Sequence, residues 1–235
     1  MRNSGKIIFA VMLLVSMLPL TSCGKSEAPG LSSGGVGGNE GGTSEEYKYP
    51  KPSQSAIRLM TYNSYYCRGN TGTPAVSQTN TENFARVIKT LDADIVAIQE
   101  LDKGALNRNK RDLLQEIADA TGIDYQVVFA PAADYMGGKI GPGVLVKRSL
   151  GVKSTKTVEL PGDEGRMLVV VETEGFVFLG THLDLNDEAR RQSATIINDV
   201  SNGYRKPVFL AGDLNDSHRS VSYTHLRAHE TRSNL

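Results

Sequence analysis

The chain has 235 residues, in which 26 Lys and Arg balance 26 Asp and Glu, so the formal net charge at pH 7 is zero. The first 22 residues carry two basic and no acidic side chains, so their removal leaves 24 basic against 26 acidic residues, a net charge of −2. Without a basic excess a chain makes few phosphate contacts along a long polyanion. The charge balance therefore argues mildly against a dedicated nucleic-acid binder.

Residues 1–22 are typical of an export signal, with two basic residues before the apolar run 7–20, which is short for a membrane span. The run ends in Leu-Thr-Ser-Cys, which resembles the lipobox of bacterial lipoproteins, where the signal is cut before a cysteine that becomes lipidated. We therefore expect lipidation of Cys23. This places the protein in the cell envelope on a bacterial membrane, with the outer membrane favoured, facing the periplasm or the cell surface. The alternative is an ordinary secretory signal with an incidental cysteine.

Residues 23–55 follow as a linker rich in Gly, Ser and Pro, a composition that cannot bury enough apolar surface to order itself. The folded body is expected at residues 56–219. With Cys23 lipidated, Cys67 is the other cysteine of the chain, so no intrachain disulfide is expected and we interpret Cys67 as a passive thiol.

The body alternates between helical and extended patterns in chain order. Phe84, Val87, Ile88 and Leu91 share one helix face, and Asn80 or Thr81 is the expected N-cap. A second helix is expected around residues 113–118 and a third around 189–200, ending at Gly122 and Gly203. The expected strands are 57–62, 94–99, 125–130, 143–147, 152–160, 167–172, 176–181 and 207–211. The arrangement predicts a layered α/β sandwich.

Four of the expected strands run directly into polar clusters. The clusters begin at Asn63, at Gln99-Glu100, at Thr181-His182 and at Gly212-Asp213-Leu214-Asn215. We expect these side chains at one rim of the sheets. Carboxylates, amides and an imidazole at one rim suit a hard metal ion and a phosphate ester.

In their order and spacing, these four motifs resemble the endonuclease/exonuclease/phosphatase superfamily over about residues 56–216. That superfamily includes pancreatic-type deoxyribonucleases, abasic-site endonucleases, bacterial sphingomyelinases and inositol-polyphosphate phosphatases. The resemblance implies the corresponding layered fold and the hydrolysis of phosphate esters with Mg²⁺ or Mn²⁺ as cofactor.

The resemblance also implies a role for each motif residue. Glu100 is the principal metal ligand, and Asn63 helps to position metal or phosphate. Asp213 orients or deprotonates the attacking water, Asn215 binds a phosphate oxygen, and His182 donates to another. Each motif alone has a plainer interpretation: a solvated strand end, a turn, or a buried core histidine. Their joint order favours the site.

Two further residues match the family less closely. Arg166 corresponds to a family arginine before a core strand, and either a phosphate contact or a supporting salt bridge for Glu100 or its neighbours fits it. Many relatives carry a tyrosine near Ile140, which this chain lacks. Tyr135 is a candidate substitute for it.

The family's final Ser-Asp-His motif does not occur, and His218 does not take its role because it follows Asn215 too closely. We expect a truncated, inactive chain in which residues 220–235 resemble translated sequencing-adapter sequence. A natural polar tail is the alternative, and failure of the chain to fold is a further possibility.

The interpretation is a membrane-anchored, metal-dependent phosphodiesterase or phosphatase with a phosphate ester as its substrate. A secreted nuclease acting on extracellular DNA and a degenerate surface binding module remain alternatives. Nucleic acid is possible but not favoured as a partner, and no protein partner is predicted.

Overall fold

The central strands bury both of their faces, and this determines the layers of the molecule. In β3 (Ile95–Lys103), Ile95 and Ala97 belong to the apolar cluster between two sheets, whereas Val96 and Ile98 belong to the cluster under the helices. This period of two is the geometry of a pleated strand with apolar partners on both sides. The structure, a computed structural model, describes residues 7–9, 49–68, 78–217 and 220–228.

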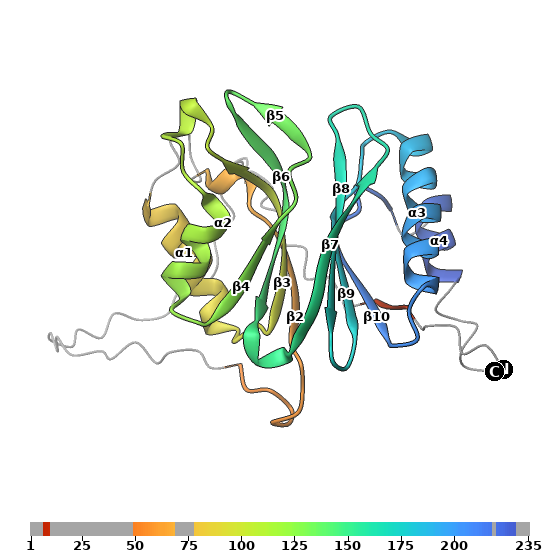
Figure 1. Cartoon of the computed structure of the whole chain (residues 1–235), viewed down its shortest axis with the longest axis horizontal. Helices are drawn as coiled ribbons and strands as arrows, with labels where there is room; N and C mark the ends of the chain where they lie inside the picture. Colours follow the sequence, from red (N-terminus) through yellow and green to blue (C-terminus); the bar gives the residue numbers. More distant parts are fainter. Residues whose placement is uncertain (1–6, 10–48, 69–77, 218–219, 229–235) are drawn as a thin grey trace, which may run out of the picture.

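Two sheets pack face to face, as Figure 1 shows. The first has the strand order β1 (Ile7–Phe9), β10 (Val208–Asp213), β9 (Val177–His182), β8 (Arg166–Thr173) and β7 (Val152–Leu160). The second has the order β2 (Leu59–Asn63), β3, β6 (Gly138–Lys147) and β4 (Tyr125–Phe129), with β5 (Ala133–Tyr135) paired to β6.

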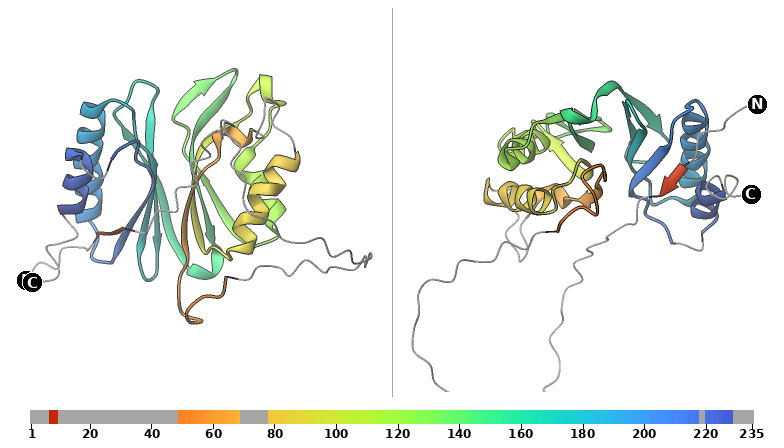
Figure 2. Two further views of the ribbon diagram at one scale, coloured as in Figure 1. Left: turned by 180° about the vertical axis from the view of Figure 1, so that it is seen from behind. Right: turned by 90° about the horizontal axis from the view of Figure 1, so that it is seen from below.

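Helices cover the outer face of each sheet (Figures 1 and 2). On the second sheet lie α1 (Gln78–Thr90) and α2 (Leu113–Thr121), and on the first lie α3 (Asp187–Asn202) and α4 (Val221–Ala228). The short 3-10 helices are η1 (Tyr65–Cys67), η2 (Leu106–Arg108) and η3 (Arg148–Leu150). The predicted layered α/β sandwich is therefore confirmed.

Parallel pairing places the four motif-bearing strand ends together. β2 pairs with β3 in parallel, and β9 pairs with β10 in parallel, whereas β3–β6 and β7–β8–β9 are antiparallel. Parallel neighbours end at the same edge of a sheet. Because β2 and β10 also lie against each other across the sandwich, both pairs end at one rim.

Several element boundaries differ from the sequence-based expectations. α1 begins at Gln78, before both predicted caps, and Asn80 instead donates a hydrogen bond to the carbonyl of Cys67. The β5–β6 hairpin was not predicted: the expected strand 143–147 forms only the second half of β6, and Gly138, Gly141 and Pro142 interrupt the strand pattern in its first half. α4 lies where no element was expected, with Leu226 buried in the apolar cluster beneath α3.

Most of the predicted signal and the linker up to residue 48, including Cys23, lie outside the described residues. Within the described part, Ile7–Phe9 runs parallel to β10 at its edge, and Lys51 forms an ion pair with Asp94 at 2.6 Å. No helix of the described residues is long and apolar enough to cross a bilayer.

Gly180 in β9 allows the sheets to approach. A Cβ at this position would lie 2.7 Å from Val144 Cγ2 and 3.3 Å from the Cβ of Ala97, both on the opposite sheet. Gly180→Ala should therefore lower the free energy of unfolding by about 1–3 kcal/mol through overpacking, as measured by urea denaturation.

Gly175→Ala provides the matched control, because a Cβ there meets no atom within 4 Å. We expect it to stay within about 0.5 kcal/mol of the wild type. Equal stability of the two variants would contradict the close contact between the sheets.

Candidate functional site

Glu100 reaches the rim through a bulge in β3. The β3–β6 register runs from Ile98 opposite Gly143 to Leu101 opposite Gly141, so two residues of β3 face the single residue Pro142. Proline has no N–H to donate to the ladder and is tolerated at such irregularities. Glu100 adopts a left-handed φ of 55°, and the bulge re-aims its side chain.

Ser64 braces the bulge from the neighbouring strand end. Its side chain is buried, and its hydroxyl lies 3.0 Å from the carbonyl oxygen of Gln99 and 2.8 Å from that of Glu100. The backbone N–H of Ser64 donates to Gln99 as well, at 3.0 Å. Ser64 therefore fixes the backbone conformation of Gln99 and Glu100 within the bulge.

Asn63 joins the two sheets through its side-chain amide. Its Nδ2 donates to Glu100 Oε1 at 2.8 Å and to Asp213 Oδ2 at 3.0 Å, while its Oδ1 accepts from the N–H of Tyr65 at 3.0 Å. This pattern assigns the amide orientation, because a reversed amide would set an acceptor against two carboxylates. Asn63 thus presents its nitrogen to the carboxylates, and its oxygen is engaged elsewhere.

Asp213 and Asn215 come together through a turn. Asn215 has a φ of 48°, and its N–H donates to Asp213 Oδ1 at 3.0 Å. The two side chains therefore do not lie on one face of an extended strand, because the strand ends at Asp213. The preceding Gly212 is required for close approach, because a Cβ there would lie 2.1 Å from the carbonyl oxygen of Thr181.

Asn215 also holds His182. Asn215 Nδ2 lies 3.0 Å from His182 Nε2 and donates to the carbonyl of Leu183 at 2.9 Å. An amide nitrogen can only donate, so Nε2 accepts and the proton of the neutral ring resides on Nδ1. Burial lowers the pKa of His182 from 6.5 to about 4, and Arg166 acts in the same direction against the Asp213 carboxylate. The imidazole is therefore neutral at pH 7.

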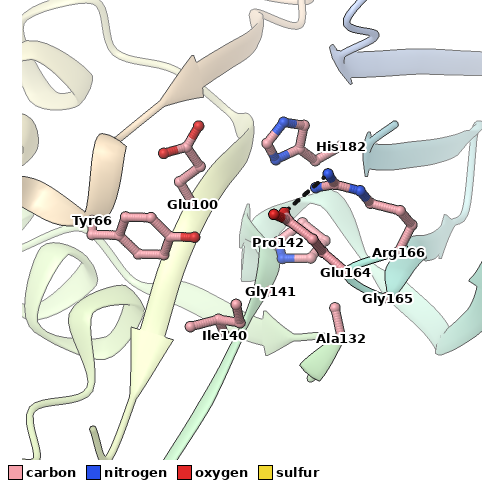
Figure 3. A pocket seen from close by; sticks show the side chains of 10 residues that line it. All are labelled: Tyr66, Glu100, Ala132, Ile140, Gly141, Pro142, Glu164, Gly165, Arg166 and His182. Carbon is pink, nitrogen blue, oxygen red and sulfur yellow. Dashed lines mark hydrogen bonds and ion pairs between the residues drawn. The ribbon is translucent and has the colours of Figure 1, made fainter. Parts of the chain in front are cut away.

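A pocket opens beside this network, as Figure 3 shows. Tyr66, Glu100, Arg166 and His182 contribute to its wall; its other lining residues are Ala132, Ile140, Gly141, Pro142, Glu164 and Gly165. Sequence reasoning did not single out Tyr66, although it lies three residues after Asn63. Burial and the negative charge of Glu100 raise the pKa of Tyr66, which keeps its hydroxyl protonated.

The two less closely matched residues have different surroundings. Arg166 lines the pocket and pairs with Asp184 at 3.0 Å and with Glu164 at 3.3 Å, so its salt bridges go to these residues and not to Glu100. Tyr135 is not part of the pocket wall; its hydroxyl accepts from Asn107 at 3.2 Å.

The donor set fits a hard divalent cation bound through one or two carboxylates. Glu100 and Asp213 converge on one nitrogen, and Glu100 Oε2 accepts no hydrogen bond from the residues that the structure describes. Mg²⁺ often keeps several waters and needs few protein ligands. Over the described ranges, no group of three or more His, Cys, Asp and Glu side chains forms a metal cage.

Known proteins share this architecture. Residues 60–233 match the model of the Endonuclease/Exonuclease/phosphatase family. No curated protein is significantly similar in sequence. A solved endonuclease/exonuclease/phosphatase from Beutenbergia cavernae is 20% identical with a TM-score of 0.55, over 74% of this chain and 52% of that chain. A mannosyl-6-phosphatase from Bacteroides thetaiotaomicron is 19% identical with a TM-score of 0.55, over 74% of this chain and 70% of that one.

A further family protein from Bacteroides thetaiotaomicron is 17% identical, with a TM-score of 0.56 over 73% of this chain and 66% of that chain. At these identities the similarity concerns the fold. The chain spans about half the length of the Beutenbergia protein.

The environment of His182 predicts an unusual titration. Its ring should titrate near pH 4, and the chain should lose about 3 kcal/mol of stability as the pH falls from 6.5 to 4, because the unfolded ring takes up a proton that the folded ring refuses. Histidine-ring NMR shifts followed against pH test this, with His182→Asn identifying the resonance. A midpoint near 6.5 would contradict the buried, neutral ring.

Proposed function

The chain belongs to the endonuclease/exonuclease/phosphatase family, and from that premise we propose that its rim site hydrolyses phosphate esters with a divalent cation, Mg²⁺ or Mn²⁺. The observation that carries the proposal is the convergence of Glu100 and Asp213 on the Asn63 amide, one carboxylate from each sheet. Two carboxylates beside a neutral imidazole form a donor set suited to metal-assisted attack on phosphorus.

Glu100 is the residue that would hold the cation, aided by Asp213. A bound divalent cation would neutralise charge on the phosphoryl oxygens. Glu100 Oε2, which accepts no hydrogen bond from the described residues, supports this role. Asn63 Nδ2 donates to both carboxylates and so fixes their separation. Asn63 is therefore a positioning residue in this proposal.

Asp213 is the group that we assign to orient or deprotonate the attacking water. Its Oδ1 and Oδ2 each accept one hydrogen bond, which leaves a second lone pair on each oxygen. His182, neutral and protonated on Nδ1, would donate to a phosphoryl oxygen. Both hydrogens of Asn215 Nδ2 are engaged, so Asn215 contributes by fixing His182.

Small phosphomonoesters or phosphodiesters are the favoured substrates. A net charge of zero, or of −2 once residues 1–22 are removed, offers no attraction to long DNA, and the pocket arginine, Arg166, is already paired with two carboxylates. The structural similarity to a mannosyl-6-phosphatase agrees with a small substrate. We also propose that Cys23 is lipidated and anchors the domain to an envelope membrane.

Glu100→Gln tests the metal-dependent reaction. The variant should reduce hydrolysis of bis-p-nitrophenyl phosphate or p-nitrophenyl phosphate by at least about a hundredfold, since a metal-held charge contributes several kcal/mol to such reactions. EDTA should abolish wild-type turnover, and Mg²⁺ or Mn²⁺ should restore it. Glu159→Gln, an exposed carboxylate on β7, serves as the control and should remain as active as the wild type.

The alternatives give different results in the same assay. Cleavage of DNA that weakens steeply with salt, without activity on small esters, would indicate a nuclease. Absence of metal-dependent turnover in a folded chain would contradict the hydrolase proposal for this sequence. It would agree with the expected inactivity of a chain without the Ser-Asp-His motif, or with a binding module.

A further inference from the structure

Tyr66 stands on a strained turn directly after the Asn63 strand end. Three consecutive non-glycine residues, Tyr65, Tyr66 and Cys67, have φ values of 47°, 55° and 51°. The left-handed conformation costs roughly 1–2 kcal/mol per residue for L-amino acids and is seldom found in succession. Such conformations persist where the surroundings over-determine them, often at functional sites.

Contacts on both sides of the turn hold it in place. Cys67 is fully buried in the apolar cluster beneath α1 and α2, and its N–H donates to the carbonyl of Ser64 at 2.9 Å. The N–H of Tyr65 donates to the side chain of Asn63, and the carbonyl of Cys67 accepts from Asn80. Between these anchors, Tyr66 projects away from the apolar cluster and into the pocket.

A buried ion pair supports the ring of Tyr66 from behind. The guanidinium carbon of Arg108 lies 4.3 Å from the centroid of the Tyr66 ring, within the range of a cation–π contact. Arg108 Nη1 donates to Asp102 Oδ2 at 2.6 Å, and the two side chains are 7% and 0% exposed. A buried ion pair adds little net stability, because both charges lose their hydration. We therefore interpret the Arg108–Asp102 pair as a group that positions the Tyr66 ring.

The same strand supplies both sides of this arrangement. β3 carries Glu100 into the pocket and, two residues later, Asp102, which pairs with Arg108. The guanidinium of Arg108 in turn lies over the ring of Tyr66. In Figure 3 the Tyr66 hydroxyl points into the pocket, across from Arg166 and His182. That hydroxyl makes no hydrogen bond with the described residues, whereas Arg166 is held by Asp184 and Glu164.

We propose that the Tyr66 hydroxyl donates a hydrogen bond to a phosphoryl oxygen of the bound ester, and that Arg108, neutralised by Asp102, is the positioning residue that fixes the ring. This inference rests on the proposed function in requiring a phosphoryl group in the pocket.

The test is the affinity of the full chain for inorganic phosphate, measured by NMR titration of backbone amides with and without Mg²⁺. Tyr66→Phe keeps the ring on Arg108 and removes the hydroxyl, so the dissociation constant should rise roughly tenfold, the effect of one hydrogen bond to a charged group. Tyr65→Phe removes the same group from the neighbouring side chain, which is 60% exposed, and should stay within about twofold of the wild type.

Arg108→Lys tests the positioning role. It keeps a cation beside Asp102 but loses the flat face against the ring, so phosphate affinity should fall about as far as in Tyr66→Phe. The variant with both substitutions should bind phosphate no more weakly than either single variant. Once Arg108→Lys has displaced the ring, its hydroxyl no longer reaches the phosphoryl group, so removing it has no further effect. Additive losses would overturn the positioning role, since a merely structural arginine would lower affinity independently of the hydroxyl.

The outcomes separate this inference from the proposed function. Wild-type affinity in Tyr66→Phe would overturn the role of Tyr66, whereas hydrolysis that is lost in Glu100→Gln would leave the phosphoesterase proposal standing. Weakened phosphate binding in Tyr66→Phe, in a chain without turnover, would support the phosphate contact while the hydrolase proposal fails. A wild-type chain that binds no phosphate would overturn the Tyr66 contact, and the turnover assay with Glu100→Gln would still decide the hydrolase proposal.

Discussion

The approach of the two sheets near the rim is the constraint on which the site depends. Gly180, Ala97 and Ala211 lie on the inner faces, two or three residues before His182, Glu100 and Asp213 respectively. Small residues there let the backbones come close, as dense packing of an interior requires. The Asn63 amide can then reach a carboxylate on each sheet, at 2.8 Å and 3.0 Å. A wider separation would leave two half-sites without a common pocket.

Several residues near this rim have backbone conformations or positions that their residue types disfavour. Pro142 lies within a central strand, Glu100 and Asn215 have left-handed φ values, and the turn carrying Tyr66 contains three such residues in succession. Each is held by neighbouring hydrogen bonds, by burial, or by both. At the opposite end of the sandwich, Lys51, Lys147, Asp92 and Asp94 form an ion-pair network, and among these four only Asp92 has a left-handed φ, of 47°.

Strand patterns and strand-end motifs were predictable because they depend on local periodicity. The alternation in β3 and the buried sides of α1, α2 and α3 confirm the expected layers, although Val87, predicted on the apolar face of α1, is 36% exposed. The five motif residues meet as the rim prediction requires. Family resemblance supplied the roles assigned to them, and those roles remain proposals. The β5–β6 hairpin escaped prediction because its Gly and Pro content hides a strand that a bulge makes possible.

The sequence by itself determined which polar side chains stand at strand ends, because apolar periodicity and chain order are local properties. Only the tertiary structure decided how they are used. It directed the nitrogen of Asn63 to two carboxylates, paired Arg166 with Asp184, and left Tyr135 outside the pocket. It also brought Tyr66 beside Glu100 on a stack formed by Arg108. These partners lie up to 150 positions apart, and their meeting depends on sheet packing and backbone conformation that no local pattern records.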